Sequence, residues 1–266
     1  MTGRRLLLIL VVGTGLAGVA RAEPGEWKQV GNAGDWKDTA AGVRLHNRIY
    51  TVEKNGGLYV TDPATGGWKQ LGKAEFANTT LMLAAGGKLY TIESDGSLYR
   101  VSPNDGSWEQ VGDAGAWKDT IAGVSLDNRI YTVEKNGGLY VTDPATGGWK
   151  QLGKADFANT TLMFAAGGKL YTIESDGSLY RVSPTDGSWE QVGDAGAWKD
   201  TIAGVTLDNR IYTVEKNGGL YVTDPANGGW TQLGKADFAN TAFLFAARGK
   251  LDTIETDGSL YEVSIN

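Results

Sequence analysis

Cysteine is absent from this 266-residue sequence, so the protein has neither disulfide bonds nor a thiol that acts as nucleophile or metal ligand. Histidine occurs once, at His46, in a turn whose counterparts further along the chain are Asp127 and Asp208. We therefore interpret His46 as a surface turn residue and not as a catalytic base. The sequence also has no Gly-x-Ser-x-Gly motif and no phosphate-binding loop. These absences predict a protein that is not an enzyme, with no catalytic residue, no metal site and no cofactor.

Basic residues are in the minority, with 25 Lys and Arg against 31 Asp and Glu. Three of the basic residues, Arg4, Arg5 and Arg21, lie within the first 22 residues, and the rest of the chain has a net charge of −9. Nucleic acids and anionic membrane surfaces both attract proteins through clustered basic residues. We therefore expect no nucleic-acid partner and no binding to an anionic membrane.

Long apolar runs are scarce as well. The longest spans residues 6–20, about 15 residues where a membrane-spanning helix needs about 20. The basic pair Arg4-Arg5 precedes it, and Ala20-Arg21-Ala22 supplies the small residues of a cleavage site. We predict that residues 1–22 are a signal peptide, cut before Glu23, and that residues 23–266 are secreted or periplasmic without membrane insertion. A retained membrane anchor is the alternative.

Two aromatic positions recur and define six repeated units. The first is a tryptophan whose steps alternate between 41 and 40 residues, at Trp27, Trp68, Trp108, Trp149, Trp189 and Trp230. The second follows it by nine residues in odd units and by eight in even ones, at Trp36, Phe76, Trp117, Phe157, Trp198 and Phe238. Because odd and even units differ, the duplicated element is a pair of about 81 residues, and residues 23–266 contain three tandem pairs.

Each unit alternates apolar and polar residues with a period of two, interrupted by Gly, Asn and Asp. In the third unit the extended segments cover residues 120–126, 129–134, 138–142 and 149–152. Short turns rich in Asn, Asp and Gly between such segments are strong hairpin signals, because these residues accept a positive φ. The pattern predicts four short antiparallel strands in every unit and no helix.

Six tandem sheets with apolar residues on both faces bury those faces against each other, and a closed ring leaves only short edges. The sequence therefore predicts an all-β fold, a six-bladed β-propeller. The chain begins with a fourth-strand segment at residues 26–30 and ends with a third-strand segment at residues 260–263. We expect the N-terminal strand to complete the last blade. A linear solenoid is the alternative, but it does not require this offset.

One unit contains, in order, Trp149-x-Gln-Leu-Gly153, Phe157, Leu162-Met163-Phe164, Gly168-Lys-Leu-Tyr171 and Gly177-Ser-Leu-Tyr180. This order resembles the repeat of the tachylectin-2 and tectonin group of propeller lectins, and the resemblance covers all six units. It implies sugar pockets between neighbouring blades, framed by the loop that enters the innermost strand. The matching loops are residues 112–117 in odd units and 153–157 in even ones. The family has a tighter Gly-Gly-Trp turn, and a second aromatic where this chain has Thr120.

The loop into the first strand and the turn between the second and third strands lie on the same face of a four-stranded blade. An aromatic ring beside a carboxylate suits a pyranose, whose C–H face stacks on the ring while its hydroxyls bind the acid. We predict that ligand-binding residues gather there, namely Trp36, Asp38, Glu53, Phe76, Asn78, Trp117, Asp119, Glu134, Phe157, Asn159, Trp198, Asp200, Glu215, Phe238 and Asn240. Each tryptophan has an alternative role as a buried plug between blades, since large aromatics are more often buried than displayed.

A glutamate ends the second strand of every unit, at Glu53, Glu93, Glu134, Glu174, Glu215 and Glu255. We favour a structural role for it, in which the carboxylate accepts hydrogen bonds from loop amides, over contact with a ligand. The last unit departs from the pattern, because Asp252 replaces Tyr90 and Tyr171, and Arg248 replaces a glycine. These changes predict a blade that is packed differently or that forms an interaction edge.

Every candidate group is repeated around the ring, which suits multivalent binding better than a single catalytic constellation. We therefore predict a lectin for glycans, for example neutral or N-acetylated sugars. The alternative is a non-catalytic scaffold that binds another protein of the envelope or extracellular space. A carboxylate-lined channel with glycosidase or lyase activity is the enzymatic alternative. Calcium bound at the Asp and Asn turns is a further possibility, although no turn has the complete pattern.

Overall fold

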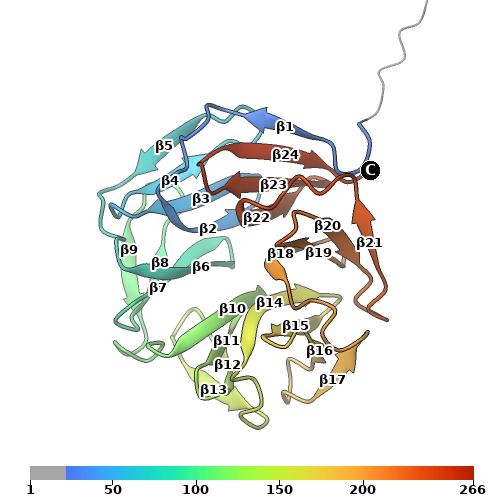
Figure 1. Cartoon of the computed structure of the whole chain (residues 1–266). Helices are drawn as coiled ribbons and strands as arrows, with labels where there is room; N and C mark the ends of the chain where they lie inside the picture. Colours follow the sequence, from blue (N-terminus) through green and yellow to red (C-terminus); the bar gives the residue numbers. More distant parts are fainter. Residues whose placement is uncertain (1–21) are drawn as a thin grey trace, which may run out of the picture.

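A computed structural model describes residues 22–266 of the protein. The predicted signal peptide therefore lies outside the described residues, apart from Ala22. Residues 22–266 form six four-stranded antiparallel sheets around a central axis, as Figure 1 shows. No helix in this range is long and apolar enough to cross a membrane. The prediction of a six-bladed β-propeller is confirmed.

The strands fall into four classes by their position in the blade. The innermost strands are β2 (Thr39–Leu45), β6 (Thr79–Ala85), β10 (Thr120–Leu126), β14 (Thr160–Ala166), β18 (Thr201–Leu207) and β22 (Thr241–Ala247). The second strands are β3 (Arg48–Glu53), β7 (Lys88–Glu93), β11 (Arg129–Glu134), β15 (Lys169–Glu174), β19 (Arg210–Glu215) and β23 (Lys250–Glu255). The third strands are β4 (Leu58–Thr61), β8 (Leu98–Val101), β12 (Leu139–Thr142), β16 (Leu179–Val182), β20 (Leu220–Thr223) and β24 (Leu260–Ser264). The outermost strands are β1 (Trp27–Val30), β5 (Trp68–Leu71), β9 (Trp108–Val111), β13 (Trp149–Leu152), β17 (Trp189–Val192) and β21 (Trp230–Leu233).

We number the blades by their innermost strand, from blade 1 (β2–β5) to blade 6 (β22–β24 with β1). The hairpin turns follow the expected chemistry: Asp127 and Asn128, between β10 and β11, have φ values of 49° and 58°. Each innermost strand also carries a register shift near its start, between Thr120 and Ala122 in blade 3. This bulge places Thr120 directly opposite Glu134.

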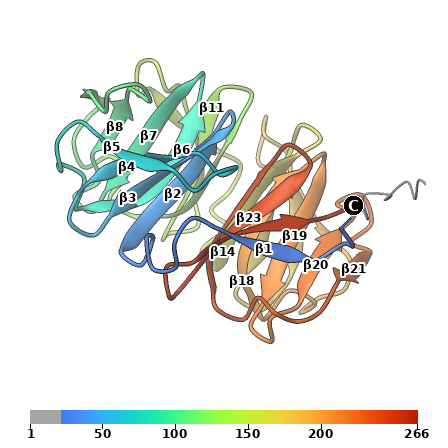
Figure 2. The same ribbon diagram turned by 90° about the horizontal axis from the view of Figure 1, so that it is seen from above.

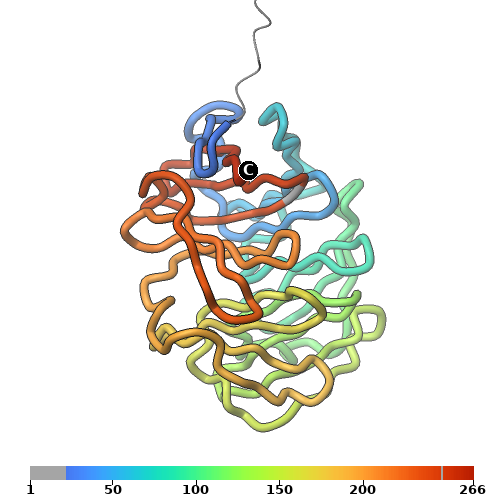
Figure 3. Tube along the Cα trace, turned by 90° about the vertical axis from the view of Figure 1, so that its right-hand side faces the viewer, coloured from blue at the N-terminus to red at the C-terminus, as the bar shows by residue number. Residues whose placement is uncertain are grey.

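The N-terminal strand closes the ring. Blade 6 has the strand order β1-β24-β23-β22, and Lys28 lies opposite Glu262. Figure 1 shows β1 beside β24, and both turned views keep the N-terminal segment next to the C-terminal one (Figures 2 and 3). The offset predicted from the sequence is confirmed.

The hydrophobic core consists of separate clusters between neighbouring blades. Between blades 1 and 2, for example, Val52 and Leu58 pack with Phe76, Met82 and Leu89. Fully burying an aliphatic or aromatic side chain of this size stabilises a protein by about 1.5–3 kcal/mol. Because each cluster needs residues from two blades, a blade depends on its neighbours for stability.

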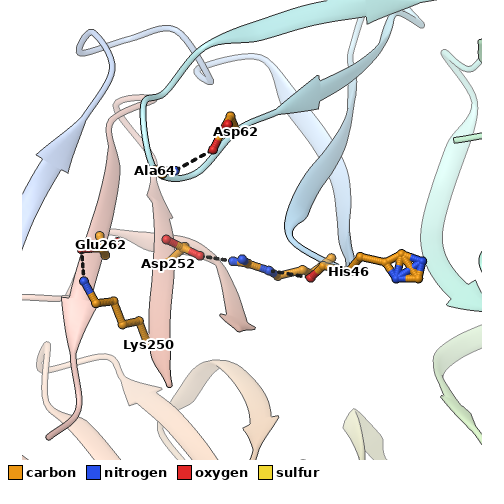
Figure 4. A network of polar contacts seen from close by, with 7 residues as sticks. His46, Asp62, Ala64, Lys250, Asp252 and Glu262 are labelled. Atoms are coloured by element: carbon orange, nitrogen blue, oxygen red, sulfur yellow. Dashed lines mark hydrogen bonds and ion pairs between the residues drawn. The ribbon is translucent and has the colours of Figure 1, made fainter. Parts of the chain in front are cut away.

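The seam between blades 6 and 1 is packed differently from the other contacts, as the substitution at Asp252 predicted. In blade 2 the hydroxyl of Tyr90 donates a hydrogen bond to the carbonyl oxygen of Pro144 in blade 3, at 3.3 Å. In blade 6 the buried Asp252 forms an ion pair with Arg44 of blade 1 instead. Figure 4 shows this seam, where Lys250 also contacts Glu262. An ion pair therefore replaces a tyrosine contact where the ring closes.

The seam makes stability depend on pH. Burial raises the pKa of Asp252 to about 6, and the attraction of Arg44 only partly offsets this rise. An unfolded aspartate has a pKa of about 3.9, so between about pH 4 and 6 the folded protein binds this proton more strongly. The resulting stabilisation is complete below about pH 4 and is lost as pH rises through 6.

We expect the free energy of unfolding, measured with urea, to fall by about 1–3 kcal/mol from Asp252 as pH rises through this window. Burial also raises the pKa of the six repeated glutamates, which adds a change of the same sign. Asp252→Asn is the control, because it removes one titrating group and leaves the glutamates. An unchanged pH slope in this variant would contradict the assignment.

Candidate functional site

The three tryptophans predicted to be exposed sugar platforms are buried. Trp36, Trp117 and Trp198 are each only 3% exposed, and the prediction that their rings are displayed at the surface is therefore wrong. The alternative, a plug between two blades, is confirmed: Trp117 packs with Leu83 and Ile92 of blade 2 and Ile130 of blade 3.

The connecting loop holds these rings in place. The backbone N–H of Trp36 donates to the carbonyl oxygen of Gly258 in blade 6 at 3.1 Å, and its indole Nε1–H donates to Thr61 Oγ1 at 3.2 Å. A Cβ at Gly31 would lie 2.7 Å from the ring, so only glycine fits there. The aromatic positions of the even blades behave in the same way, because Phe76, Phe157 and Phe238 are 1–2% exposed. Their rings are therefore not displayed to a ligand either.

The predicted polar residues lie at the surface. Asp38, Asp119 and Asp200 are well exposed, and each pairs with the lysine after the repeated glutamate, at 3.1–3.6 Å. The corresponding asparagines of the even blades, Asn78, Asn159 and Asn240, are exposed as well. Their backbone carbonyl oxygens accept hydrogen bonds from Ser94, Ser175 and Thr256 at 2.8 Å.

Each repeated glutamate forms a contact within its blade, but its partner differs from the prediction. Glu53 accepts a hydrogen bond from the Thr39 hydroxyl at 2.9 Å, and the other blades repeat this pair at 2.6–2.9 Å. The loop amides are bound by a different residue: in blade 1 the N–H of Gly57 donates to Asn55 Oδ1. The bulge at the start of the innermost strand explains the difference, because it brings the threonine opposite the glutamate.

Six other tryptophans are exposed, and sequence reasoning did not propose them as binding residues. They open the outermost strands and are 42–53% exposed: Trp27, Trp68, Trp108, Trp149, Trp189 and Trp230. Each ring packs against a tyrosine of the neighbouring third strand, with centroids 4.5–5.0 Å apart. We call these six tryptophans the rim tryptophans. The sequence did indicate that these rings are exposed. In β5, Trp68 and the buried Leu71 are three residues apart, and in a strand this spacing places their side chains on opposite faces.

Four of the rim tryptophans lie beside a carboxylate of the connecting loop. The indole N–H groups of Trp27, Trp68, Trp108 and Trp189 donate to Asp237, Asp35, Glu75 and Asp156, at 2.9–3.4 Å. At Trp149 and Trp230 the equivalent loop positions are Ala116 and Ala197. The six positions therefore share an aromatic pair but differ in whether a carboxylate accepts the indole N–H.

A cavity of about 170 Å³ lies next to the rim tryptophan of blade 1. Its lining includes the aromatic pair Tyr59 and Trp68, the carboxylates Asp35 and Glu53, and Thr51 from β3. Asp38, Lys37 and Asn55 complete the polar lining, and Trp36 borders the cavity although its ring is buried. Of the predicted residues, Asp38 and Glu53 are thus brought together, but the exposed aromatic ring beside them is Trp68.

Thr51 also lines this cavity, and its side chain is fully buried. Burial raises the pKa of Glu53, and hydrogen bonds from the hydroxyls of Thr39 and Thr51 partly offset this rise. A buried threonine occupies the equivalent position of every other blade: Thr91, Thr132, Thr172, Thr213 and Thr253.

Four cavities lined by the described residues are larger than this one, and two of them are the central channel and a groove between blades 2 and 3. The central channel, about 550 Å³, is lined by the innermost strands and is mainly apolar, with Leu81, Leu162, Ile202 and Phe243 among its residues. A groove of about 1010 Å³ between blades 2 and 3 has a charged lining, in which Arg100 pairs with Glu109 at 2.6 Å. The residues that the structure describes contain no cluster of three or more His, Cys, Asp or Glu side chains suited to a metal ion.

Six four-stranded blades, closed by the first strand of the chain, define a six-bladed β-propeller with repeated aromatic sites on its rim. The chain belongs to the DUF6242 beta propeller domain family, whose model matches residues 25–162 and 124–245. No curated protein sequence gives a significant match.

Several solved structures share this fold at low sequence identity. A protein of unknown function from Bacteroides thetaiotaomicron is 12% identical with a TM-score of 0.66, over 92% of this chain and 73% of the other. Virginiamycin B lyase from Staphylococcus aureus is 11% identical with a TM-score of 0.60, over 91% and 89% of the two chains. YCF48 bound to D1 peptide is 16% identical with a TM-score of 0.58, over 86% and 78%. These matches support the propeller fold and contain nothing specific to the tachylectin-2 and tectonin lectins.

Proposed function

We propose that the protein is an exported, non-catalytic, multivalent carbohydrate-binding protein whose sugar sites lie at the rim tryptophans. The observation that carries this proposal is the cavity of blade 1, where the exposed Trp68, packed edge-on with Tyr59, stands beside the carboxylates of Asp35 and Glu53. A sugar ring stacks its C–H face on Trp68 with Tyr59 at its edge, and its hydroxyls bind Glu53 and Asp35. At about 170 Å³ the cavity is smaller than the pockets of drug-sized ligands, which suits a single sugar unit.

A shallow site of this kind binds weakly when alone. We expect a dissociation constant near the millimolar range, or about −4 kcal/mol, because water competes for every exposed hydroxyl. Several sites on one rigid ring raise the avidity for a dense glycan surface by roughly 10² to 10⁴ without any new contact. The repeated, rigid arrangement is therefore the basis of useful affinity.

The test replaces the rim tryptophans of blades 1, 3 and 5 together, as Trp68→Ala, Trp149→Ala and Trp230→Ala. We expect retention on a glycan resin to fall at least about tenfold, because half of the sites are lost. The matched control replaces the residue after each tryptophan, as Lys69→Ala, Lys150→Ala and Thr231→Ala, and should keep its retention. Unchanged binding by the tryptophan variant would contradict the proposal.

A protein-binding scaffold is the second candidate, and the wide groove between blades 2 and 3 favours it. Its paired charges resemble a polar interface, and the propeller YCF48 has been solved with a peptide bound. Glycan-array binding that free monosaccharide displaces supports the lectin. Binding to an envelope protein that monosaccharide does not displace supports the scaffold.

A further inference from the structure

The rim sites differ in whether a loop carboxylate lies at the indole N–H. The site of blade 1 shows which atoms of that carboxylate are available to a ligand. The negative charge of Asp38 is offset by Lys54, whose Nζ lies 3.6 Å from the carboxylate. Neither Asp35 nor Glu53 has an ion-pair partner within residues 22–266. Both hydrogen bonds to Asp35, from Asn32 at 3.2 Å and from Trp68 at 3.3 Å, use Oδ2. Oδ1 is therefore open to a ligand in the cavity.

Carboxylates beside the face of an aromatic pair form a favourable environment for a cation. The ring faces attract positive charge through their quadrupole, and the carboxylates accept N–H hydrogen bonds. Glu53 adds a second carboxylate at the same cavity. A neutral sugar uses only part of this arrangement, whereas a sugar with a protonated amine uses all of it.

On the basis of the proposed sugar-binding function, we infer that the four rim sites whose indole N–H donates to a loop carboxylate select amino sugars, through a protonated amine held between that carboxylate and the aromatic pair. The even blades extend this argument, because Ala77, Ala158 and Ala239 replace Lys37, and Asp95, Asp176 and Asp257 replace Asn55. The loops at Trp149 and Trp230 have alanine at the position of Asp35, and their aspartates, Asp113 and Asp194, lie three residues earlier. We expect these two sites to lack the preference, because no carboxylate in the described part of the chain accepts their indole N–H.

The experiment follows the indole N–H signals of Trp68 and Trp149 by NMR during titration of the whole mature protein, near pH 6, with glucosamine, N-acetylglucosamine or glucose. At Trp68 we expect glucosamine to bind about tenfold more tightly than the two neutral sugars. At Trp149 we expect the three sugars to bind equally. Added salt should weaken only the glucosamine preference, because it screens charge.

Two substitutions test whether the carboxylate beside the indole N–H sets the preference, one by removing it at Trp68 and one by adding it at Trp149. Asp35→Asn keeps the shape of the site and removes the charge, so it should abolish the preference of the Trp68 site for glucosamine over glucose. Ala116→Asp should create the preference at Trp149. Equal binding of the three sugars at Trp68 in the unmodified protein would overturn this inference and leave the sugar-binding function intact. If none of the three sugars shifted either signal, the proposed function would fail as well.

Discussion

Deleting residues 25–31 from the mature protein is expected to destabilise the entire ring. The deletion removes β1, which pairs with β24 over four residues and buries Val30 at the seam. Each hydrogen bond contributes about 1 kcal/mol and burial of valine about 1.5–3 kcal/mol. The total, roughly 5 kcal/mol or more, is comparable with the whole stability of many domains.

The measurement is urea denaturation of the shortened protein beside the full mature one. A variant that begins at Gly25 serves as the control, because it keeps β1 and loses only residues before it. We expect this control to unfold at nearly the same urea concentration as the full mature protein. If the protein without residues 25–31 were equally stable, β1 would not close the ring.

Replacing Trp117 with alanine has the second-largest expected effect. The ring is 3% exposed and packs among Leu83, Ile92 and Ile130, so its removal leaves a cavity between blades 2 and 3. Deleting a buried aromatic ring typically costs about 3–5 kcal/mol. We expect a loss of this size in the free energy of unfolding.

Trp149→Ala is the matched control, since it removes the same side chain from a position that is 49% exposed. Its ring packs only edge-on against Tyr140, a contact worth about 0.5–1.5 kcal/mol. A similar loss in the two variants would show that burial does not distinguish the two classes of tryptophan.

The fold was predictable because its signals are local. The alternation of apolar residues, the hairpin turns and the regular tryptophan spacing each act over a few residues or one blade. The offset between the first and last segments then predicted closure by β1. These features need no knowledge of which side chains meet across blades.

The site was less predictable because its geometry depends on the path of the connecting loop. Trp36 is buried since its loop folds back on blade 6, where the Trp36 N–H donates a hydrogen bond to Gly258, and since Gly31 lets the loop pass close to Gly66 of blade 1. The glutamate partners depend on a bulge that shifts the register by one residue. Trp68 was assigned only to the repeat pattern, although its position opposite Leu71 indicated an exposed ring.

The ion pair between blades 6 and 1 could be predicted only by considering two substituted positions, Arg44 and Asp252, at the same time. Asp252 was recognised as an exception, but its partner Arg44, where blades 3 and 5 have Ser125 and Thr206, was not. Only the contact between blades 6 and 1 shows that the two substitutions form one ion pair.

The central claim is that the rim tryptophans bind sugar, and a crystal structure of the protein with a bound oligosaccharide tests it most directly. We predict a sugar ring stacked on Trp68 with Tyr59 at its edge, with hydroxyl groups within hydrogen-bond distance of Glu53 and Asp35, and equivalent rings at other blades. A sugar bound only in the central channel, or only in the groove between blades 2 and 3 without contact to Trp108, would contradict the claim.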